Sequence, residues 1–126
     1  MSHTIIYNSE ERLIEIKVQG DFSLREAKEI FAEAVQVVKA QNCFLVRTDM
    51  REATMKLSML EIYELPKKLA VKVDSLGFSV HKLKRALVVK KDLNDYRFFE
   101  DVASNRAQSV KYFFDMNEAR KWLSGK

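Results

Sequence analysis

Residues 85–90 read R-A-L-V-V-K, and residues 43–46 read C-F-L-V. Each apolar run is too short for a helix and leaves no polar face, which is typical of an interior strand of a parallel sheet that is covered on both sides. We therefore predict buried strands over residues 44–46 and 86–89. Charged residues follow both runs, so a polar loop is expected at the carboxyl end of each strand.

Working outward, residues 4–8 and 12–19 are β-rich runs separated by three polar residues, which is the spacing of a hairpin. Apolar and polar residues alternate in the second run, so one face of that strand should meet water. Gly20 and Asp21 are expected to end it. A last strand is predicted over residues 110–114.

Helices are predicted from capping patterns followed by apolar residues at three- and four-residue steps. Ser23 with Glu26 begins a helix that should run to about Ala40, and Ser58 with Glu61 begins a second one. The expected apolar stripe of the second helix is Leu60, Ile62, Tyr63, Leu65, Leu69, Val73 and Leu76.

Pro66 lies inside that second helix and lacks the N–H that a helix interior uses, so the segment should either kink or restart there. Further helices are predicted over residues 93–107 and after Asp115, which is followed by the apolar residues Ala119, Trp122 and Leu123. The element order is therefore β-β-α-β-α-β-α-β-α. It predicts a single α/β domain over residues 1–126, with a five-stranded, mainly parallel sheet and an N-terminal β-hairpin.

Composition narrows the class of protein. The chain has 126 residues, 47% of them apolar, with three Gly and one Pro, which favours one folded core over a disordered chain. The single Cys43 excludes an internal disulfide and a cysteine-rich metal site. No apolar run approaches the roughly 20 residues of a membrane span, and the N-terminus lacks a signal-peptide pattern. We expect a soluble, cytoplasmic protein.

Four motifs carry a family resemblance: D-M-R-E-A-T at 49–54, E-I-Y-E-L-P at 61–66, R-A-L-V-V at 85–89 and F-F-D-M-N-E-A-R-K-W-L at 113–123. With the opening hairpin, these resemble the SpoIIAA-like domains, a STAS-type family related in fold to CRAL-TRIO lipid-binding domains. The resemblance covers almost the whole chain. It implies the SpoIIAA-like (STAS) fold and a non-catalytic regulatory or protein-interaction role.

The resemblance also directs attention to the region before the second helix. In anti-sigma-factor antagonists of that family, an Asp-Ser pair followed by a small residue and Gly opens this helix, and a partner kinase phosphorylates the Ser. The matching region here runs through Asp49, Arg51, Thr54 and Ser58 and has neither an Asp-Ser step nor a Gly. Ser58 is the nearest hydroxyl at a helix start, where it serves either as a phosphate acceptor or simply as a cap.

Two polar patterns have a functional and a structural interpretation. Asp49 and Arg51 either grip a ligand carboxylate or phosphate or form an ion pair that orders a loop. Four aspartates each follow the end of a predicted strand, which suits either a cation site or helix and loop capping: Asp21, Asp49, Asp92 and Asp115. No catalytic motif accompanies them or the two histidines, His3 and His81. We predict no enzyme activity, no metal and no cofactor.

The middle of the chain is basic. Residues 67–91 hold eight basic residues and one acidic residue, which leaves the rest of the chain net negative. These side chains form either a solvated face or one surface for an anionic partner: Lys67, Lys68, Lys72, Lys82, Lys84 and Arg85. Nucleic acid is not the expected partner, because no aromatic RNA-binding motif or helix-turn-helix pattern is present.

The sequence thus predicts a regulatory domain that binds an unidentified protein through Asp49, Arg51, Thr54 and Ser58. The alternative is a lipid-binding or small-ligand module of CRAL-TRIO-like kinship, in which apolar side chains of residues 59–78 line a pocket for a small apolar or anionic ligand. Because the main helices should cover one face of the sheet, the other face needs a cover, and a homodimer would supply one.

Overall fold

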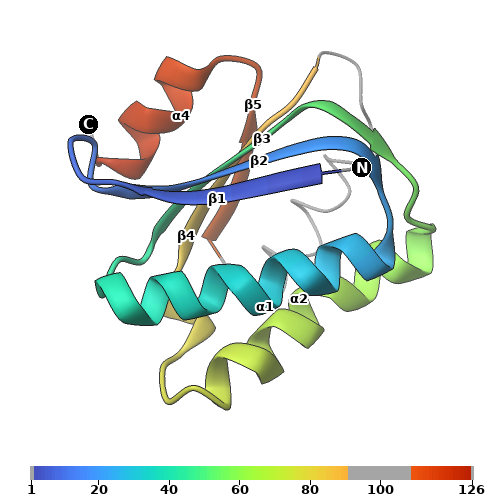
Figure 1. Ribbon diagram of the computed structural model, residues 1–126, viewed down its shortest axis with the longest axis horizontal. Helices are drawn as coiled ribbons and strands as arrows, with labels where there is room; N and C mark the ends of the chain where they lie inside the picture. Colours follow the sequence, from blue (N-terminus) through green and yellow to red (C-terminus); the bar gives the residue numbers. More distant parts are fainter. Residues whose placement is uncertain (1, 91–108, 126) are drawn as a thin grey trace.

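A computed structural model of the chain describes residues 2–90 and 109–125. Its centre is a five-stranded sheet with the strand order β1-β2-β3-β4-β5 (Figure 1). The strands are β1 (Ser2–Asn8), β2 (Leu13–Phe22), β3 (Leu45–Met55), β4 (Lys84–Val88) and β5 (Ser109–Phe113). β1 pairs antiparallel with β2, and the remaining pairs are parallel, which confirms the predicted hairpin and mainly parallel sheet.

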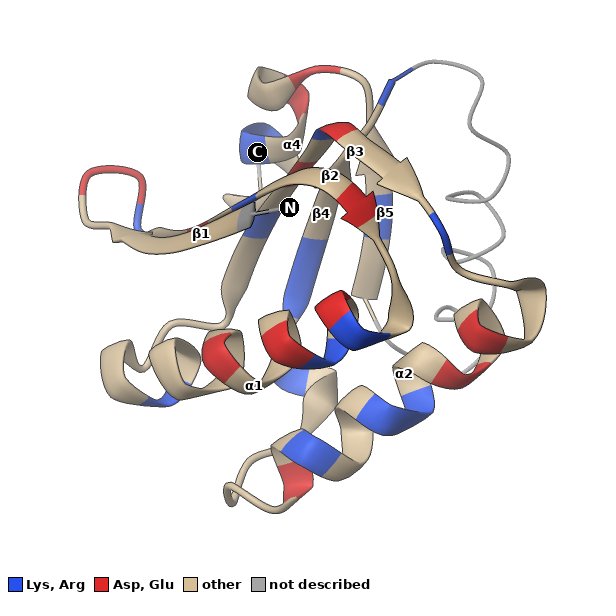
Figure 2. Cartoon of the chain, turned by 45° about the vertical axis from the view of Figure 1, so that its right-hand side comes forward, with Lys and Arg blue, Asp and Glu red and all other residues tan. Residues whose placement is uncertain are grey.

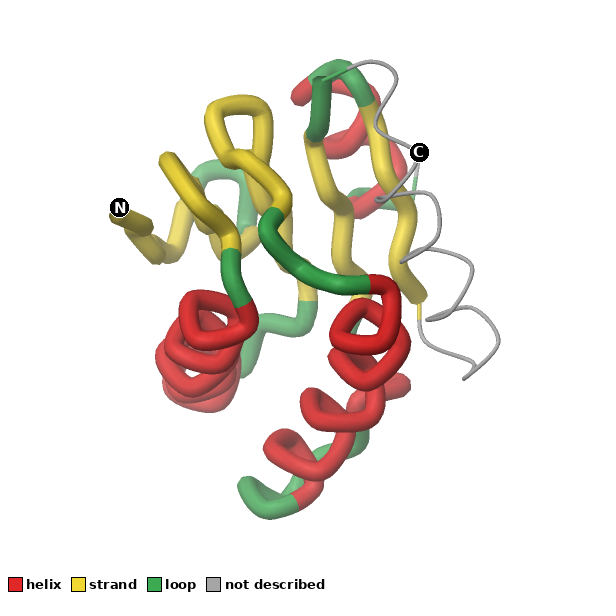
Figure 3. Tube along the Cα trace, turned by 90° about the vertical axis from the view of Figure 1, so that its right-hand side faces the viewer, coloured by secondary structure: helices red, strands yellow, loops and turns green. Residues whose placement is uncertain are grey.

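Helices lie on both faces of the sheet (Figures 1 and 3). α1 (Leu24–Gln41) and α2 (Met59–Asp74) cover one face, α4 (Met116–Leu123) packs on the other, and a short 3-10 helix, η1 (Val80–Lys82), precedes β4. The predicted helix over 93–107 and Asp92 lie outside the described residues. α4 thus covers part of the face for which we expected a second copy, and homodimerisation stays a prediction. In the described part of the chain, no helix is both long and apolar enough to cross a membrane.

The two apolar runs are interior strands, as predicted. Val46, Ala86, Val88 and Val89 are buried. Alternate residues of each strand pack on opposite faces, one side against α1 and α2 and the other against α4. A small core under α4 contains Leu13, Ala86, Val88, Ala119 and Leu123.

β2 and β3 are longer than predicted. The structure continues β2 through Gly20 and Asp21 to Phe22, and β3 through the D-M-R-E-A-T motif to Met55, so the expected strand end and polar loop are wrong. The two extensions stabilise each other, because they pair in parallel and the Lys56 N–H donates to the Phe22 carbonyl at 3.0 Å. Backbone pairing stabilises this stretch although the motif has no continuous apolar run.

This ladder contains one irregular step. Lys17 pairs with Asp49 and Gln19 with Glu52, so two steps along β2 match three along β3. The extra residue is a β-bulge, which reverses the direction of the side chains that follow. Met50 packs in the core before the bulge, and Ala53 and Met55 pack there after it.

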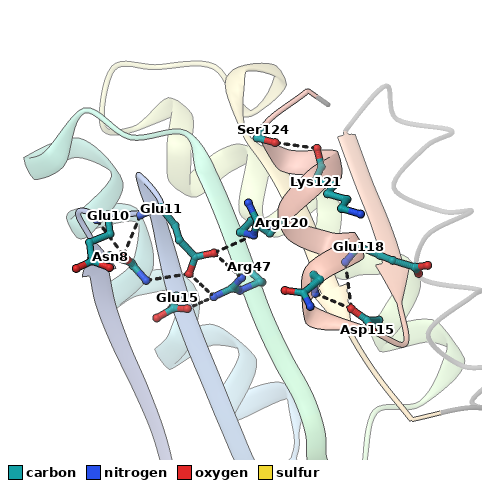
Figure 4. Close-up of polar contacts among 11 residues, drawn as sticks. Asn8, Glu10, Glu11, Glu15, Arg47, Asp115, Glu118, Arg120, Lys121 and Ser124 are labelled. Atoms are coloured by element: carbon teal, nitrogen blue, oxygen red, sulfur yellow. Dashed lines mark hydrogen bonds and ion pairs between the residues drawn. The ribbon is translucent and has the colours of Figure 1, made fainter.

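The helix starts follow the predicted caps. The Ser58 hydroxyl accepts from the Glu61 N–H at 3.1 Å, and the Glu61 carboxylate accepts from the Ser58 N–H at 2.8 Å. Asp115 caps α4 by accepting from the N–H groups of Asn117 and Glu118, as Figure 4 shows for Glu118. α2 runs unbroken through Pro66, so the predicted restart does not occur.

The start of α1 differs in one respect. The Ser23 hydroxyl accepts from the Glu26 N–H at 3.3 Å, but the Glu26 carboxylate turns to β1 and accepts from His3 Nδ1 at 2.7 Å. His3 Nε2 pairs with Glu33, which lies about two helical turns after Glu26. His3 thus joins β1 to α1 through two carboxylates, one of them buried, and no sequence motif pointed to this contact.

A buried arginine joins the hairpin to β3 under α4 (Figure 4). Arg47 donates to both carboxylate oxygens of Glu11, at 3.2 and 3.1 Å, and to Glu15. Arg120 of α4 reaches the same Glu11 at 3.5 Å. The Arg47 side chain is only 6% exposed, so this is an ion-pair cluster largely shielded from water.

We predict that Arg47→Ala lowers the free energy of unfolding by about 2–4 kcal/mol, because it leaves Glu11 and Glu15 without their buried counter-charge. Arg51→Ala is the matched control on the same strand. Its half-exposed ion pair with Asp49 should cost less than about 1 kcal/mol. Urea unfolding monitored by circular dichroism measures both. An equal loss of unfolding free energy in the two variants would contradict the structural role of Arg47.

The His3 contacts predict a pH dependence. Burial lowers the pKa of His3, but the hydrogen bonds and charges of Glu33 and Glu26 outweigh it and place the pKa above 6.5. Since the folded pKa exceeds the unfolded one, the stabilisation is complete below about pH 6.5 and is lost as the pH rises through the folded pKa.

The difference in melting temperature between the unmodified chain and His3→Gln should therefore be larger at about pH 5.5 than at about pH 8.5. Thermal unfolding at both values measures it. A melting-temperature difference between the two chains that is constant, or that grows with pH, would show that His3 is not held as its cation.

Candidate functional site

The predicted residues Asp49, Arg51 and Thr54 come together on β3 itself, not on a loop. After the bulge, the register places Glu52 and Thr54 on the same face of the sheet as Asp49. This face points away from α1 and α2. Two residues of β2 complete the group, which we call the β3 surface: Lys17, Gln19, Asp49, Arg51, Glu52 and Thr54. Figure 2 shows acidic and basic positions side by side on this part of β2 and β3.

Hydrogen bonds within the β3 surface are dense. Arg51 Nε and Nη2 each donate to Asp49 at 2.9 Å, and the Arg51 N–H donates to Asp49 Oδ1 at 3.1 Å. Glu52 accepts from Gln19 Nε2 at 2.9 Å and pairs with Lys17 Nζ at 3.3 Å. Residues two apart on a strand share a face, so Asp49 and Arg51 can form this bidentate contact.

The electrostatics keep both carboxylates ionised. Partial burial raises the pKa of Asp49, but hydrogen bonds from Arg51 outweigh that effect and hold the pKa below its ordinary value. Hydrogen bonds from Gln19 and Lys17 lower the pKa of Glu52. A general acid needs a raised pKa, so these two carboxylates are suited to charge pairing and to partner recognition rather than to proton donation.

Of the aspartates that were considered for a cation site, Asp92 lies outside the described residues. Asp21 and Asp49 lie within β2 and β3 rather than after them, and Asp115 is the cap of α4. Among residues 2–90 and 109–125, no group of three or more His, Cys, Asp or Glu side chains is arranged to hold a metal ion.

Ser58 follows β3 and begins α2, and apolar side chains stand exposed directly after it. Met59 is 53% exposed, Leu60 70% and Tyr63 48%. We predicted Leu60 and Tyr63 for the buried stripe, and this is wrong, because Ile62, Leu65 and Leu69 already fill the inward face of α2. The sequence contained the signal: residues 60 and 63 are out of step with 62, 65 and 69.

The predicted basic residues do not form one patch. Lys67, Lys68, Lys72 and Lys82 are exposed, but Lys84 lies on β4 with its Nζ 4.5 Å from the centre of the Trp122 ring, under α4. Arg85, the next residue along the strand, is buried on the opposite face of the sheet. That burial lowers the pKa of Arg85 to about 10. Strand alternation thus turns Lys84 towards α4, and Arg85 is buried beneath α1 and α2, so neither joins the exposed lysines of α2.

A cavity lies between the sheet and the pair α1 and α2. Its volume is about 80 Å³, and its walls are apolar apart from Thr48 and Arg85. Ligand pockets usually measure about 300–1,000 Å³, so this cavity is too small for a lipid. The structure therefore offers no support for the lipid-binding alternative.

Comparison with known proteins identifies the fold. No protein-family model matches the chain, and no curated protein sequence matches it significantly. An uncharacterised protein of the DUF3478 family from Shewanella loihica, described as having a SpoIIAA-like fold, superposes with a TM-score of 0.62 at 18% identity, covering 97% of this chain and 92% of that one.

The anti-sigma factor antagonist SpoIIAA in its unphosphorylated form gives a TM-score of 0.60 at 8% identity, covering 99% of this chain and 100% of the other. The Bacillus cell fate determinant SpoIIAA in its phosphorylated form gives 0.53 at 9% identity, covering 97% and 99%. The chain therefore has the SpoIIAA-like fold that its motifs implied, and its CRAL-TRIO kinship is not shown.

The role of Ser58 as a cap can be tested by stability. Ser58→Ala should lower the free energy of unfolding by about 1 kcal/mol, because the Glu61 N–H loses its acceptor. Ser58→Asp should lie within about 0.5 kcal/mol of the unmodified chain, because aspartate caps as well as serine. Denaturant unfolding measures both. A loss in Ser58→Asp as large as in Ser58→Ala would contradict capping by the side-chain oxygen.

Proposed function

We propose that this chain is a non-catalytic regulatory domain that acts by binding a protein partner. The binding surface consists of the predicted residues Asp49, Arg51, Thr54 and Ser58 together with the apolar residues that follow them. We call it the α2-entry surface, and its apolar part is Met59, Leu60 and Tyr63.

The exposed apolar side chains are the observation that carries the proposal. Leu60 is 70% exposed in a stretch where Ile62 and Leu65 already fill the inward face of α2, so the core does not require it. An apolar group bordered by polar residues is typical of a protein-binding surface, and tyrosine is enriched among residues that dominate binding energy.

We assign the polar part of the proposed surface to the β3 surface. Its charged groups are paired with one another along a strand, so they present a fixed arrangement of donors and acceptors to a partner. The bond from Lys56 to Phe22 fixes the end of β3 immediately before the turn into α2. A rigid border of this kind lowers the entropy lost on binding.

The fold relatives agree with a regulatory role. SpoIIAA is described as an anti-sigma factor antagonist, and it is known in unphosphorylated and phosphorylated forms. The region from Asp49 to Ser58 lacks the Asp-Ser step that the resemblance associates with phosphorylation, and Ser58 is engaged as a cap. The proposal therefore concerns partner binding and does not include a phosphorylation switch.

Affinity capture with the whole chain as bait tests the proposal. Leu60→Asp places a charge on the apolar part of the surface, in the first turn of α2, where aspartate does not harm the helix. Ile6→Asp is the matched control, because Ile6 is a similarly exposed apolar residue, 56% exposed, on β1.

We expect at least one cellular protein to be enriched by the unmodified chain and by Ile6→Asp, and to fall about tenfold or more with Leu60→Asp, as quantified by mass spectrometry. Thermal unfolding of each bait verifies folding. Capture that is equal with both variants, or the absence of any enriched protein, would contradict the proposal.

A further inference from the structure

A second surface lies between α1 and α2, away from the sheet. It is a groove of about 440 Å³. α1 contributes Lys28 and Phe31, and α2 contributes the remaining lining residues: Glu64, Lys67, Lys68, Val71 and Lys72. Figure 2 shows the basic positions along the outer side of α2. We call it the α1–α2 groove.

Helix periodicity explains why these residues meet. Positions 64, 67, 68, 71 and 72 recur at three- and four-residue steps and share the outer face of α2, whereas 62, 65, 69 and 73 share the buried face. Lys28 extends outward from α1 beside the buried Ala27 and Ile30. The sequence predicted the lysines of α2 as a group but not Lys28, which lies 39 residues earlier than the nearest of them.

The charge of the groove is one-sided. Four ammonium groups line it, and Glu64 is the single carboxylate among the lining residues, 4.0 Å from Lys67. An exposed ion pair such as Glu64–Lys67 contributes little to stability. The other three lysines leave the groove positively charged. Between the lysines the floor is apolar, with Val71 69% exposed and Phe31 half-buried.

We propose that the α1–α2 groove binds an acidic amphipathic segment of a protein partner. Apolar side chains of that segment would contact Phe31 and Val71, and its carboxylates would pair with the lysines on both walls. This arrangement corresponds to the recognition of an amphipathic segment by a hydrophobic groove with complementary charge around it.

The shape and the residue types favour a peptide over other anionic partners. A groove of about 440 Å³ is large enough to enclose apolar side chains, whereas a membrane surface would rest on protruding residues and leave the floor uncovered. Nucleic-acid surfaces usually add arginine forks and exposed aromatic rings for stacking. The lining residues of this groove include neither an arginine nor an exposed aromatic ring.

The groove proposal stands independently of the α2-entry surface. The groove lysines of α2 lie in its second half, beyond Leu60 and Tyr63, and Lys28 lies on α1. Substitution of Lys68 or Lys72 therefore leaves the α2-entry surface intact, and Leu60→Asp leaves the groove intact. Either proposal can fail without the other.

Selection from a random peptide library of about 16 residues per peptide, with the whole chain as target, provides the probe, since that length spans several helical turns. Enriched peptides should combine an excess of Asp and Glu with apolar residues at helical spacing. Fluorescence anisotropy of the most enriched labelled peptide then gives the dissociation constant. Lys68→Glu with Lys72→Glu should weaken binding about tenfold or more, and Val71→Asp should weaken it as well.

The matched control is Lys39→Glu with Lys56→Glu, which changes the net charge equally at exposed positions outside the groove and should alter affinity less than about threefold. Vesicles containing phosphatidylserine and single-stranded RNA serve as competing probes. The proposal is overturned if no acidic peptide is enriched, if groove and control variants lose affinity equally, or if vesicles or RNA bind through the groove lysines while the peptides do not.

Discussion

The parallel pairing of β2 with β3, including its one irregular step, is the constraint on which the rest of the structure depends. It connects the N-terminal hairpin to the parallel part of the sheet, and Arg47 reinforces it with ion pairs to the hairpin and β2. Beyond Asp49 the pairing continues without a continuous apolar run, held by backbone bonds and by the contacts of Glu52 with β2. The position at which α2 begins is therefore fixed by a strand.

The bulge determines which side chains of β3 lie on each face of the sheet. Before it Met50 enters the core, and after it Ala53 and Met55 do so, which leaves Asp49, Glu52 and Thr54 together on the opposite side. A regular strand would have placed Asp49 and Glu52 on different faces. The bulge thus creates the β3 surface, whereas the α1–α2 groove arises separately from the outward faces of two helices.

Much of the fold was predictable because its signals are local. Capping at Ser58 and Asp115, the hairpin and the two apolar strands each follow from a few neighbouring residues, and the structure confirms them. The extension of β3 was not predictable in this way, because backbone pairing with β2 replaces an apolar pattern and the bulge hides the alternation. The same limit applies to Arg85: only the packing of helices on the sheet decides that it is buried.

The candidate sites show a similar division. Asp49, Arg51 and Thr54 were identified together from the motif, but their placement on a strand was not. The exposure of Leu60 and Tyr63 follows from helix phase once the inward stripe is known, and the position of Lys28 beside the α2 lysines follows only from the packing of α1 against α2. A surface formed by one helix or strand can thus be predicted from the sequence. A surface formed by two such elements can be identified only once their packing is known.

Hydrogen exchange of the backbone amides of residues 51–56 tests the central claim most directly, because it reports whether this segment is a paired strand or a loop. The account predicts that the amide of Lys56, bonded to Phe22, and the paired amides of β3 exchange far more slowly than unstructured peptide of the same sequence. Exchange of the whole segment at the rate of unstructured peptide would contradict it.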